Sequence, residues 1–451
     1  MTQEAGHGWT AGSNEEAVRL DQSVFHSWSA QAGRTPLVLA SGAGSRVWDF
    51  DGNSYLDFSS QLVNTNIGHQ HPAVVEAIAA QAAVQVTVAP QHASMVRGRA
   101  AQAILDVAPP GHSKVFFTNG GADAAENAIR MARRHTGRHK VLSFYRSYHG
   151  NTGAAITATG DPRRWPNEYA YGHVHFFGPY LYRSSFWAET PEQECERALA
   201  HLEQVITFEG PATIAAVLIE SVVGTAGVLV PPPGYLAGVR ALCDKYGIVY
   251  IADEVMSGFG RTGAWLAIDH WDVDPDLIIF AKGSNSGYVP LGGVIISDAI
   301  AATFDDRVFP GGLTYSGHPL ACASALATIT AMREEGIVEH AARVGTEVIG
   351  PGLADLAERH PVIGEVRGLG VMWALELVAD RATREPLAPY GGTSEAMGVL
   401  TKGCLRRGLL PFTNFNRLHV VPPCVVTDDE AREGLAILDE ALADVDRYYR
   451  G

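Results

Sequence analysis

Two side chains of opposite charge follow apolar runs of the sequence. Lys282 ends the run DLIIFAKG, and Asp253 ends the run GIVYIAD. The chain has few lysines, and a lysine at the end of a buried strand lies where a ligand can bind, although it can also extend to water. A buried carboxylate needs a cation or hydrogen-bond donors, because burying it alone is costly. A protonated pyridine nitrogen would serve Asp253, and so would a helix cap or a salt bridge to Arg261.

Two further motifs follow predicted strands. KVFFTNGGADAAENAIRMARRH has the pattern of a strand, a Gly-Gly turn and a helix. Free amides at a helix start can bind a phosphate when glycines allow close approach, although the pattern also fits an ordinary strand-to-helix turn. SYHG (residues 147–150) ends another strand, so Tyr148 lies at the same edge of the sheet, where it can stack on a ligand or simply pack.

These residues require a sheet whose strands end together. From about residue 62 to 313, short apolar runs alternate with amphipathic stretches, which predicts βαβ units and a mostly parallel sheet. In such α/β sheets, ligands bind at the carboxyl ends of the strands. The predicted strands are 114–118, 141–145, 215–220, 248–253, 277–281 and 293–296, and the helices between them include 122–135 and 235–246.

The remaining segments predict a second, smaller lobe. VWDFDGNSYLDF (residues 47–58) has the pattern of a hairpin, and the chain after residue 315 predicts helices, a strand-like VRGLGVMWALEL, further helices and LHVVPP. We predict an N-terminal segment 1–61 that contributes to a small domain, a large domain 62–320 and a C-terminal α+β domain 321–451. Residues 161–187 are crowded with aromatic side chains, which predicts a functional or interface loop.

Composition narrows the class of protein. The chain has 451 residues, 46% of them hydrophobic, and a net charge of -15, which disfavours nucleic acid and membrane surfaces as partners. Its five cysteines are scattered and form no zinc-spaced cluster with histidine, which predicts reduced thiols and no metal. Residues 1–22 are polar and acidic, unlike a secretory signal, and no run approaches the ~20 apolar residues of a membrane span. We therefore expect a cytoplasmic protein.

Taken together, the motifs resemble the class III (ω-amino acid) aminotransferases, which are fold type I pyridoxal phosphate enzymes. The residues that carry the resemblance are NGGADAAENA, SYHG, DEVMSGFGRTG, FAKGSNSGYVPLGG and GGLTYSGHPLACASALA, in this order along the chain. The resemblance implies an α/β fold, with a large domain built on a mostly parallel, seven-stranded-type sheet flanked by helices, and a smaller α+β domain. It also implies a homodimer.

The resemblance assigns roles to single residues. Lys282 would bond covalently to pyridoxal 5'-phosphate and act as the base, Asp253 would pair with the ring nitrogen, and Tyr148 would stack on the ring. Thr314 of the partner subunit would reach the cofactor phosphate, and Glu220 would support Asp253. The other implied cofactor contacts are Gly120, Gly121, Ala122, His149, Val255 and Met256.

Departures from the family pattern concern the substrate. Thr225 stands where glutamate-using members have a glutamate that neutralises the arginine matching Arg367. Phe412 stands where many amine and ω-amino acid:pyruvate members have a mobile arginine that binds carboxylates. Arg417 could replace that arginine or lie at the surface. Met256 replaces a glutamine, as in the amine and ω-amino acid:pyruvate members.

The sequence therefore predicts a transaminase that moves an amino group from a primary amine or ω-amino acid to a 2-oxo acid, pyruvate preferred, by a ping-pong mechanism. Leu62, Val63 and Phe412 predict an apolar pocket, in which each buried methylene contributes about 0.8 kcal/mol. One alternative is a taurine, β-alanine or 4-aminobutyrate transaminase, with Arg367 or Arg417 holding the distal acid. The others are a mutase or decarboxylase on the same scaffold and a non-catalytic cofactor-binding protein.

Overall fold

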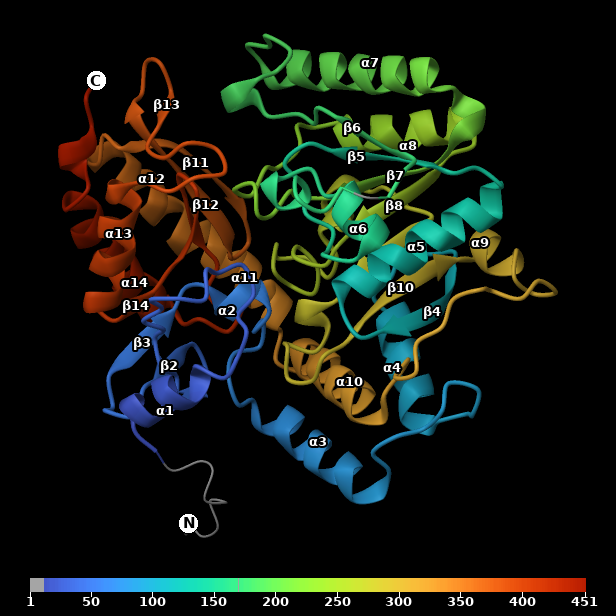
Figure 1. Cartoon of the computed structure of the whole chain (residues 1–451), viewed down its shortest axis with the longest axis horizontal. Helices are drawn as coiled ribbons and strands as arrows, with labels where there is room; N and C mark the ends of the chain where they lie inside the picture. The colour runs from blue at the N-terminus through green and yellow to red at the C-terminus, as the bar shows by residue number, and fades with distance from the viewer. Residues whose placement is uncertain (1–11, 169) are drawn as a thin grey trace.

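A seven-stranded sheet forms the centre of the molecule (Figure 1). The computed structural model describes residues 12–168 and 170–451, so residues 1–11 of the predicted N-terminal segment and Tyr169 of the aromatic loop lie outside the described residues. The strand order is β4-β10-β9-β8-β7-β5-β6, in which β10 runs antiparallel to both neighbours and the strands from β9 to β6 are parallel. The predicted mostly parallel sheet is confirmed. Its strands are β4 (His112–Thr118), β5 (Lys140–Phe144), β6 (His173–Phe176), β7 (Ile214–Glu220), β8 (Val249–Asp253), β9 (Leu277–Phe280) and β10 (Gly292–Ser297).

The central strands are apolar because both of their faces are covered. Every residue of β7 and β8 is buried. Successive side chains of a strand point to opposite faces, so Ala216 and Leu218 pack with α5 (Gly121–Thr136), whereas Val217 and Ile219 pack with α8 (Tyr235–Tyr246) on the other face. Two further helices, α6 (Gly153–Ala158) and α7 (Pro191–Glu209), complete the layers around this sheet (Figure 1).

The sequence patterns missed one strand. β6 lies within the aromatic stretch, between the short 3-10 helices η1 (Pro162–Arg164) and η2 (Leu181–Arg183), and pairs with β5 as the edge of the sheet. An edge strand of four residues that includes two half-buried histidines carries little of the apolar alternation on which strand prediction depends. Residues 161–187 are therefore not a loop throughout.

A second lobe combines both ends of the chain. The predicted hairpin forms β2 (Arg46–Trp48) and β3 (Ser54–Asp57), and β3 pairs in parallel with β14 (Leu409–Leu410). VRGLGVMWALEL forms two antiparallel strands, β11 and β12, that turn at Gly370, where φ is +53°. The remaining strands of this lobe are β1 (Ser41–Ala43), β11 (Ile363–Leu369), β12 (Met372–Asp380), β13 (Glu385–Pro386), β15 (Phe412–Asn414) and β16 (Arg417–Val420).

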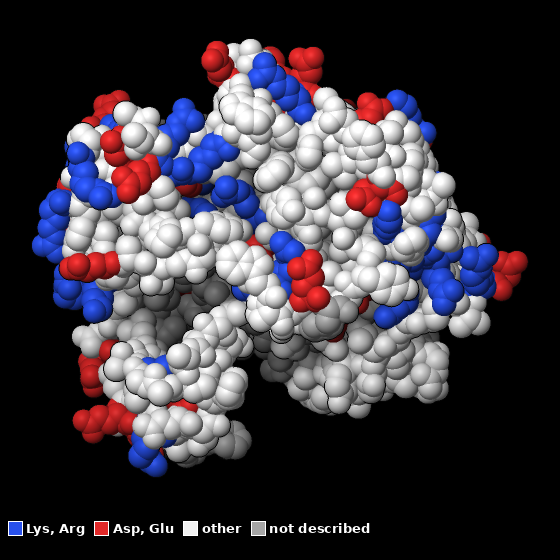
Figure 2. Space-filling view, turned by 45° about the horizontal axis from the view of Figure 1, so that its top comes forward, with Lys and Arg blue, Asp and Glu red and all other residues white. Residues whose placement is uncertain are grey.

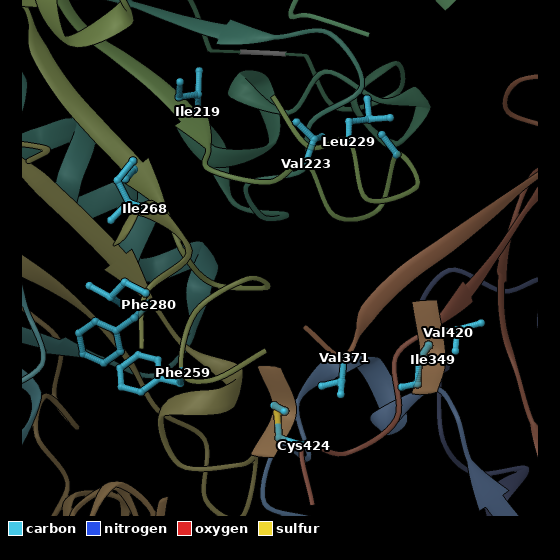
Figure 3. Close-up of a cluster of buried hydrophobic side chains, with 14 of the residues drawn as sticks. Ile219, Val223, Leu229, Phe259, Ile268, Phe280, Ile349, Val371, Val420 and Cys424 are labelled. Atoms are coloured by element: carbon cyan, nitrogen blue, oxygen red, sulfur yellow. The ribbon is translucent and has the colours of Figure 1, made fainter. Parts of the chain in front are cut away.

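One continuous core joins the two lobes. Phe259 and Phe280 pack beside the central sheet with ring centroids 5.8 Å apart, and Val371 and Val420 of the second lobe belong to the same buried cluster (Figure 3). The α10 helix (Pro319–Glu334) packs against α3 (Pro72–Val84) and α4 (Met95–Leu105), which are distant from it in the sequence. The exact limits of the domains stay a prediction. None of the described helices is long and apolar enough to cross a membrane. The other helices are α1 (Asn14–Asp21), α2 (Ser60–Val63), α3 (Pro72–Val84), α4 (Met95–Leu105), α9 (Asp298–Ala302), α10 (Pro319–Glu334), α11 (Ile337–Val344), α12 (Gly350–Arg359), α13 (Glu395–Arg406) and α14 (Asp428–Ala443).

Candidate active site

A cavity of about 850 Å³ lies at the carboxyl ends of the parallel strands. This is the edge at which α/β sheets bind ligands. Three of the predicted site residues, Thr314, Arg367 and Arg417, do not line the cavity. The structure brings the other thirteen together around it: Leu62, Val63, Gly120, Gly121, Ala122, Tyr148, His149, Glu220, Asp253, Val255, Met256, Lys282 and Phe412.

Each carboxylate oxygen of Asp253 has a hydrogen-bond partner in the protein. It ends β8, where its Oδ1 accepts a hydrogen bond from the Val255 amide at 3.0 Å. Its Oδ2 lies 2.6 Å from Nδ1 of His149, and both side chains are buried. The His149 amide in turn donates to Thr159 at 2.9 Å, which fixes the backbone that carries the imidazole. This arrangement keeps an anionic oxygen at the cavity wall, where a protonated ring nitrogen could meet it.

Glu220 lies beside Asp253 because the two residues are paired in the register of β7 and β8. Burial, together with the Asp253 charge, raises the pKa of Glu220 to about 7. Its carboxylate accepts hydrogen bonds from the amides of Tyr148 (3.0 Å) and Gly224 (2.8 Å). Glu220 therefore ties the SYHG motif to the end of the neighbouring strand.

Lys282 follows β9 and enters the cavity from a strained position. Its φ is +40°, in the left-handed region that side chains other than glycine rarely adopt, and such strain concentrates at functional sites. Burial lowers the pKa of the Lys282 amine, while the carboxylates of Asp253 and Glu220 oppose that shift. A lysine with a lowered pKa is more readily neutral, and so more able to act as a nucleophile and base.

The Gly-Gly turn presents unpaired amides to the same cavity. Gly120 is the N-cap of α5 and provides no side-chain cap for the helix start, so the first amides of α5 point at the space lined by Gly120, Gly121 and Ala122. A Cβ on Gly121 would lie 3.0 Å from Val255 Cγ1, so this turn and Val255, another of the implied cofactor contacts, lie against each other. The group of lysine, aspartate, aromatic ring and phosphate turn fits pyridoxal phosphate.

The two arginines expected at the substrate are paired elsewhere. Arg367 Nη2 donates to Glu376 at 2.8 Å, and its Nη1 forms an ion pair with Glu365. Arg417 is 3% exposed, which contradicts a surface position, and its Nε lies 3.7 Å from Glu376. Glu376 of β12 thus neutralises Arg367 in place of the glutamate that Thr225 replaces.

Sequence reasoning missed Arg163, which does line the cavity. Its guanidinium carbon lies 3.6 Å from the ring centroid of Tyr148, and its Nε donates to Asp161 at 2.9 and 3.1 Å. Nη2 lies 3.5 Å from Thr225 Oγ1. The described residues that line the cavity include one arginine, Arg163, and one lysine, Lys282. The pair of arginines in GDPRRW, inside an aromatic stretch, was the signal that could have pointed to it.

The rest of the cavity wall is largely apolar. Phe412 stacks on His419 with centroids 4.5 Å apart, and Leu62 is half exposed beside the buried Val63. The ring centroid of Trp28, in the N-terminal segment, lies 5.9 Å from the guanidinium carbon of Arg163. Within residues 12–168 and 170–451, no group of three or more His, Cys, Asp or Glu side chains could hold a metal ion.

Comparison with known proteins agrees with this geometry. The family model for aminotransferase class III matches residues 28–442. The chain belongs to the class III aminotransferases. It is therefore a transaminase, and pyridoxal phosphate is the cofactor of this family.

Individual relatives of this aminotransferase act on different amines. The solved structure of taurine:2-oxoglutarate aminotransferase from Bifidobacterium kashiwanohense, in complex with PLP and glutamate, is 42% identical, with a TM-score of 0.94 over 98% of this chain and 100% of that one. The taurine–pyruvate aminotransferase of Rhodobacter capsulatus is 36% identical over 90% of this chain and 91% of its own length. The probable 4-aminobutyrate aminotransferase of Bacillus subtilis is 34% identical over 90% and 92%.

Proposed function

We propose that this aminotransferase takes its amino group from a short ω-amino acid and passes it to a small 2-oxo acid, pyruvate preferred, by a ping-pong mechanism. The observation that carries the proposal is Arg163, a cation at the cavity wall that is separate from Lys282. An amine bound at Lys282 could place an acid group at its other end against this guanidinium. The relatives named for taurine and 4-aminobutyrate use donors of this kind.

Arg163 is suited to bind an acid group because its side chain is oriented by neighbouring residues and still has a hydrogen-bond donor available. Asp161 takes Nε and Nη2, which leaves Nη1, within the described part of the chain, without a protein acceptor. Stacking on Tyr148 fixes the plane of the guanidinium, and a fixed planar fork loses little entropy when it binds a carboxylate or sulfonate. The side chain is partly removed from solvent, which strengthens an ion pair formed there.

The number of cationic side chains available in the cavity bears on which 2-oxo acid accepts the amino group. Arg163 is the one arginine among the described residues that line the cavity, and Arg367 is neutralised by Glu376 and Glu365. A single guanidinium is therefore available to an acid group in the cavity. A 2-oxo acid with one carboxylate, such as pyruvate, needs one such partner, whereas 2-oxoglutarate has two carboxylates to satisfy. This argument supports pyruvate as the acceptor.

The proposed roles of the site residues follow from their positions. When bound, pyridoxal phosphate supplies an electron sink for the substrate carbon that loses a proton. Asp253, held by His149, keeps a negative charge at the ring nitrogen, and Lys282 moves the proton as general base and acid. The α5 amides and Thr314 of the partner subunit hold the phosphate, so the proposal includes a homodimer. We place the enzyme in the cytoplasm, as its cysteine usage predicts.

Substitution of Arg163 tests the donor. We expect Arg163→Gln to lower kcat/KM for taurine, β-alanine and 4-aminobutyrate by about 30-fold or more, since loss of one partner of a buried ion pair costs roughly 2–5 kcal/mol. The kcat/KM for 1-phenylethylamine, which has no acid group, should stay within about threefold of the wild-type value. The control is Arg164→Gln, because Arg164 pairs with Glu168 and does not line the cavity.

An equal loss for acidic and uncharged donors would contradict the role of Arg163. If the wild type prefers 1-phenylethylamine, a primary amine is the donor, which the apolar lining of Leu62 and Phe412 would favour.

The acceptor is tested by the visible absorption of the enzyme. After the donor has bleached the yellow band, pyruvate should restore it faster than 2-oxoglutarate.

A further inference from the structure

A second cavity, of about 710 Å³, lies between the C-terminal half of α5 and the segment after α9. Figure 2 shows basic side chains gathered on the side of the molecule where Figure 1 draws these two helices. We call this cavity the arginine pocket, since its lining includes five arginines, Arg130, Arg133, Arg134, Arg138 and Arg307, and one acidic residue, Glu126.

The protein neutralises the charge of the arginine pocket only in part. None of its five arginines forms a salt bridge with a carboxylate within residues 12–168 and 170–451, whereas Arg343, Arg359 and Arg407 each do so in the second lobe. Glu126 compensates only in part, because its charge acts on Arg133 while its carboxylate accepts hydrogen bonds from Thr152 and from two amides of α6 and forms no salt bridge with an arginine of the pocket. A concentration of positive charge in a protein with a net charge of -15 needs an explanation.

Helix capping explains only part of the cluster. Arg133 and Arg134 lie in the last turn of α5, where positive charge is favoured by the helix dipole. Arg138 donates from Nη1 to carbonyls of the neighbouring turns, a structural role. Neither effect accounts for Arg130 in the helix interior or for Arg307, which comes from a separate segment.

The arginines are positioned by backbone and amide contacts that leave most of their donors free. Arg133 Nε donates to the His139 carbonyl at 2.8 Å, Arg307 Nη1 to the Arg134 carbonyl at 3.1 Å, and Arg130 Nη1 to the Asn127 side chain at 2.7 Å. Burial lowers the pKa of Arg133, while the charge of Glu126 opposes that shift, so the guanidinium is partly removed from water although no carboxylate forms a salt bridge with it. An incoming anion would therefore meet guanidinium groups that are already oriented.

We propose that the arginine pocket binds a small anion with two linked phosphate groups, one per chain. Guanidinium forks match phosphate oxygens in a bidentate manner, and several guanidinium groups lining one cavity can bind more oxygens than a single phosphate offers, which favours a diphosphate. A concave volume of about 710 Å³ is the size of small-molecule sites, whereas nucleic acids bind open surfaces and are repelled by the net charge. The exposed Val308 at the rim offers an apolar contact to an organic group on the diphosphate.

The test is calorimetric titration of the cofactor-loaded enzyme with inorganic pyrophosphate, ADP and inorganic phosphate. We expect pyrophosphate and ADP to bind once per chain, with inorganic phosphate at least about tenfold weaker. Arg134→Gln combined with Arg307→Gln should weaken pyrophosphate binding at least about tenfold, since both side chains are exposed and the double variant should fold. The matched control is Arg333→Gln with Arg447→Gln, which removes the same charge from exposed positions outside the pocket.

Four outcomes would overturn the proposal. One is absence of pyrophosphate binding to the wild type at moderate salt, and another is an equal loss of affinity in the control. The third is a change of oligomeric state in the pocket variant, which would make these arginines an interface between copies of the chain. Tighter binding of ADP than of pyrophosphate would support the proposal and identify the organic group as part of the ligand. Displacement of the cofactor, seen as loss of its visible band, would assign the binding to the active site instead.

Discussion

Replacement of Glu376 by glutamine should destabilise the protein in a pH-dependent way. The carboxylate is almost fully buried and receives hydrogen bonds or ion pairs from Arg183 (2.9 Å), Arg367 (2.8 Å) and the Tyr180 hydroxyl (2.9 Å). Burial alone would raise the pKa of Glu376, but the charges of Arg367 and Arg417 and the hydrogen bonds from Arg367 and Asn416 lower it to about 2. Without this carboxylate, Arg367 would keep Glu365, whereas Arg183 and Arg417 would lose the carboxylate they face.

The size of the effect follows from the lowered pKa. A shift from an ordinary 4.5 to about 2 corresponds to about 3 kcal/mol of stability at neutral pH. A carboxylate whose pKa is lower in the folded state contributes this stability above pH 4.5 and loses it as the pH falls toward 2. We therefore expect Glu376→Gln to lower the free energy of unfolding by about 3 kcal/mol at pH 7.5 and the difference from wild type to narrow by about 1 kcal/mol at pH 3.8.

The assay is urea unfolding of wild type and variant, followed by circular dichroism with excess cofactor at each pH. Glu385→Gln serves as the control, because Glu385 and its partner Arg450 are 53% and 65% exposed and such pairs contribute under about 1 kcal/mol. A loss below about 1 kcal/mol at pH 7.5 would refute the reasoning, as would a difference that stays constant down to pH 3.8.

Three further substitutions test the cofactor site. Lys282→Ala should abolish transamination and the visible band of covalently bound cofactor while circular dichroism shows an intact fold. Gly121→Ala should weaken cofactor affinity about fivefold to tenfold, since its Cβ would lie 3.0 Å from Val255. Adding Val255→Ala in the same chain should restore much of the affinity. Failure of that rescue would show that steric contact is not the cause. Thr314→Ala should raise the cofactor dissociation constant at least about tenfold through loss of one hydrogen bond to a charged phosphate, and unchanged affinity would argue against the partner contact.

Local patterns in the sequence were sufficient for the central sheet and for the residues at its edge. Buried parallel strands read as apolar runs, so the ends of β8 and β9 could be located, and with them Asp253 and Lys282. The phosphate turn before α5 was equally local, because glycines and the start of an amphipathic helix lie within a few residues. The strand β6 escaped because an edge strand of four residues lacks such a pattern.

The partners of charged side chains were decided by the tertiary structure. Sequence reasoning left Arg367 and Arg417 available to a substrate, yet both face Glu376, which approaches Arg367 across the β11–β12 hairpin and Arg417 across the β12–β16 pair. Arg163, in contrast, reaches the cavity because η1 folds back over Tyr148. An ion pair depends on distances between side chains from different strands and loops, and no local periodicity encodes those distances. The sequence by itself therefore determined the sheet and the edge at which the cavity lies, whereas only the folded chain determined which arginine lines that cavity.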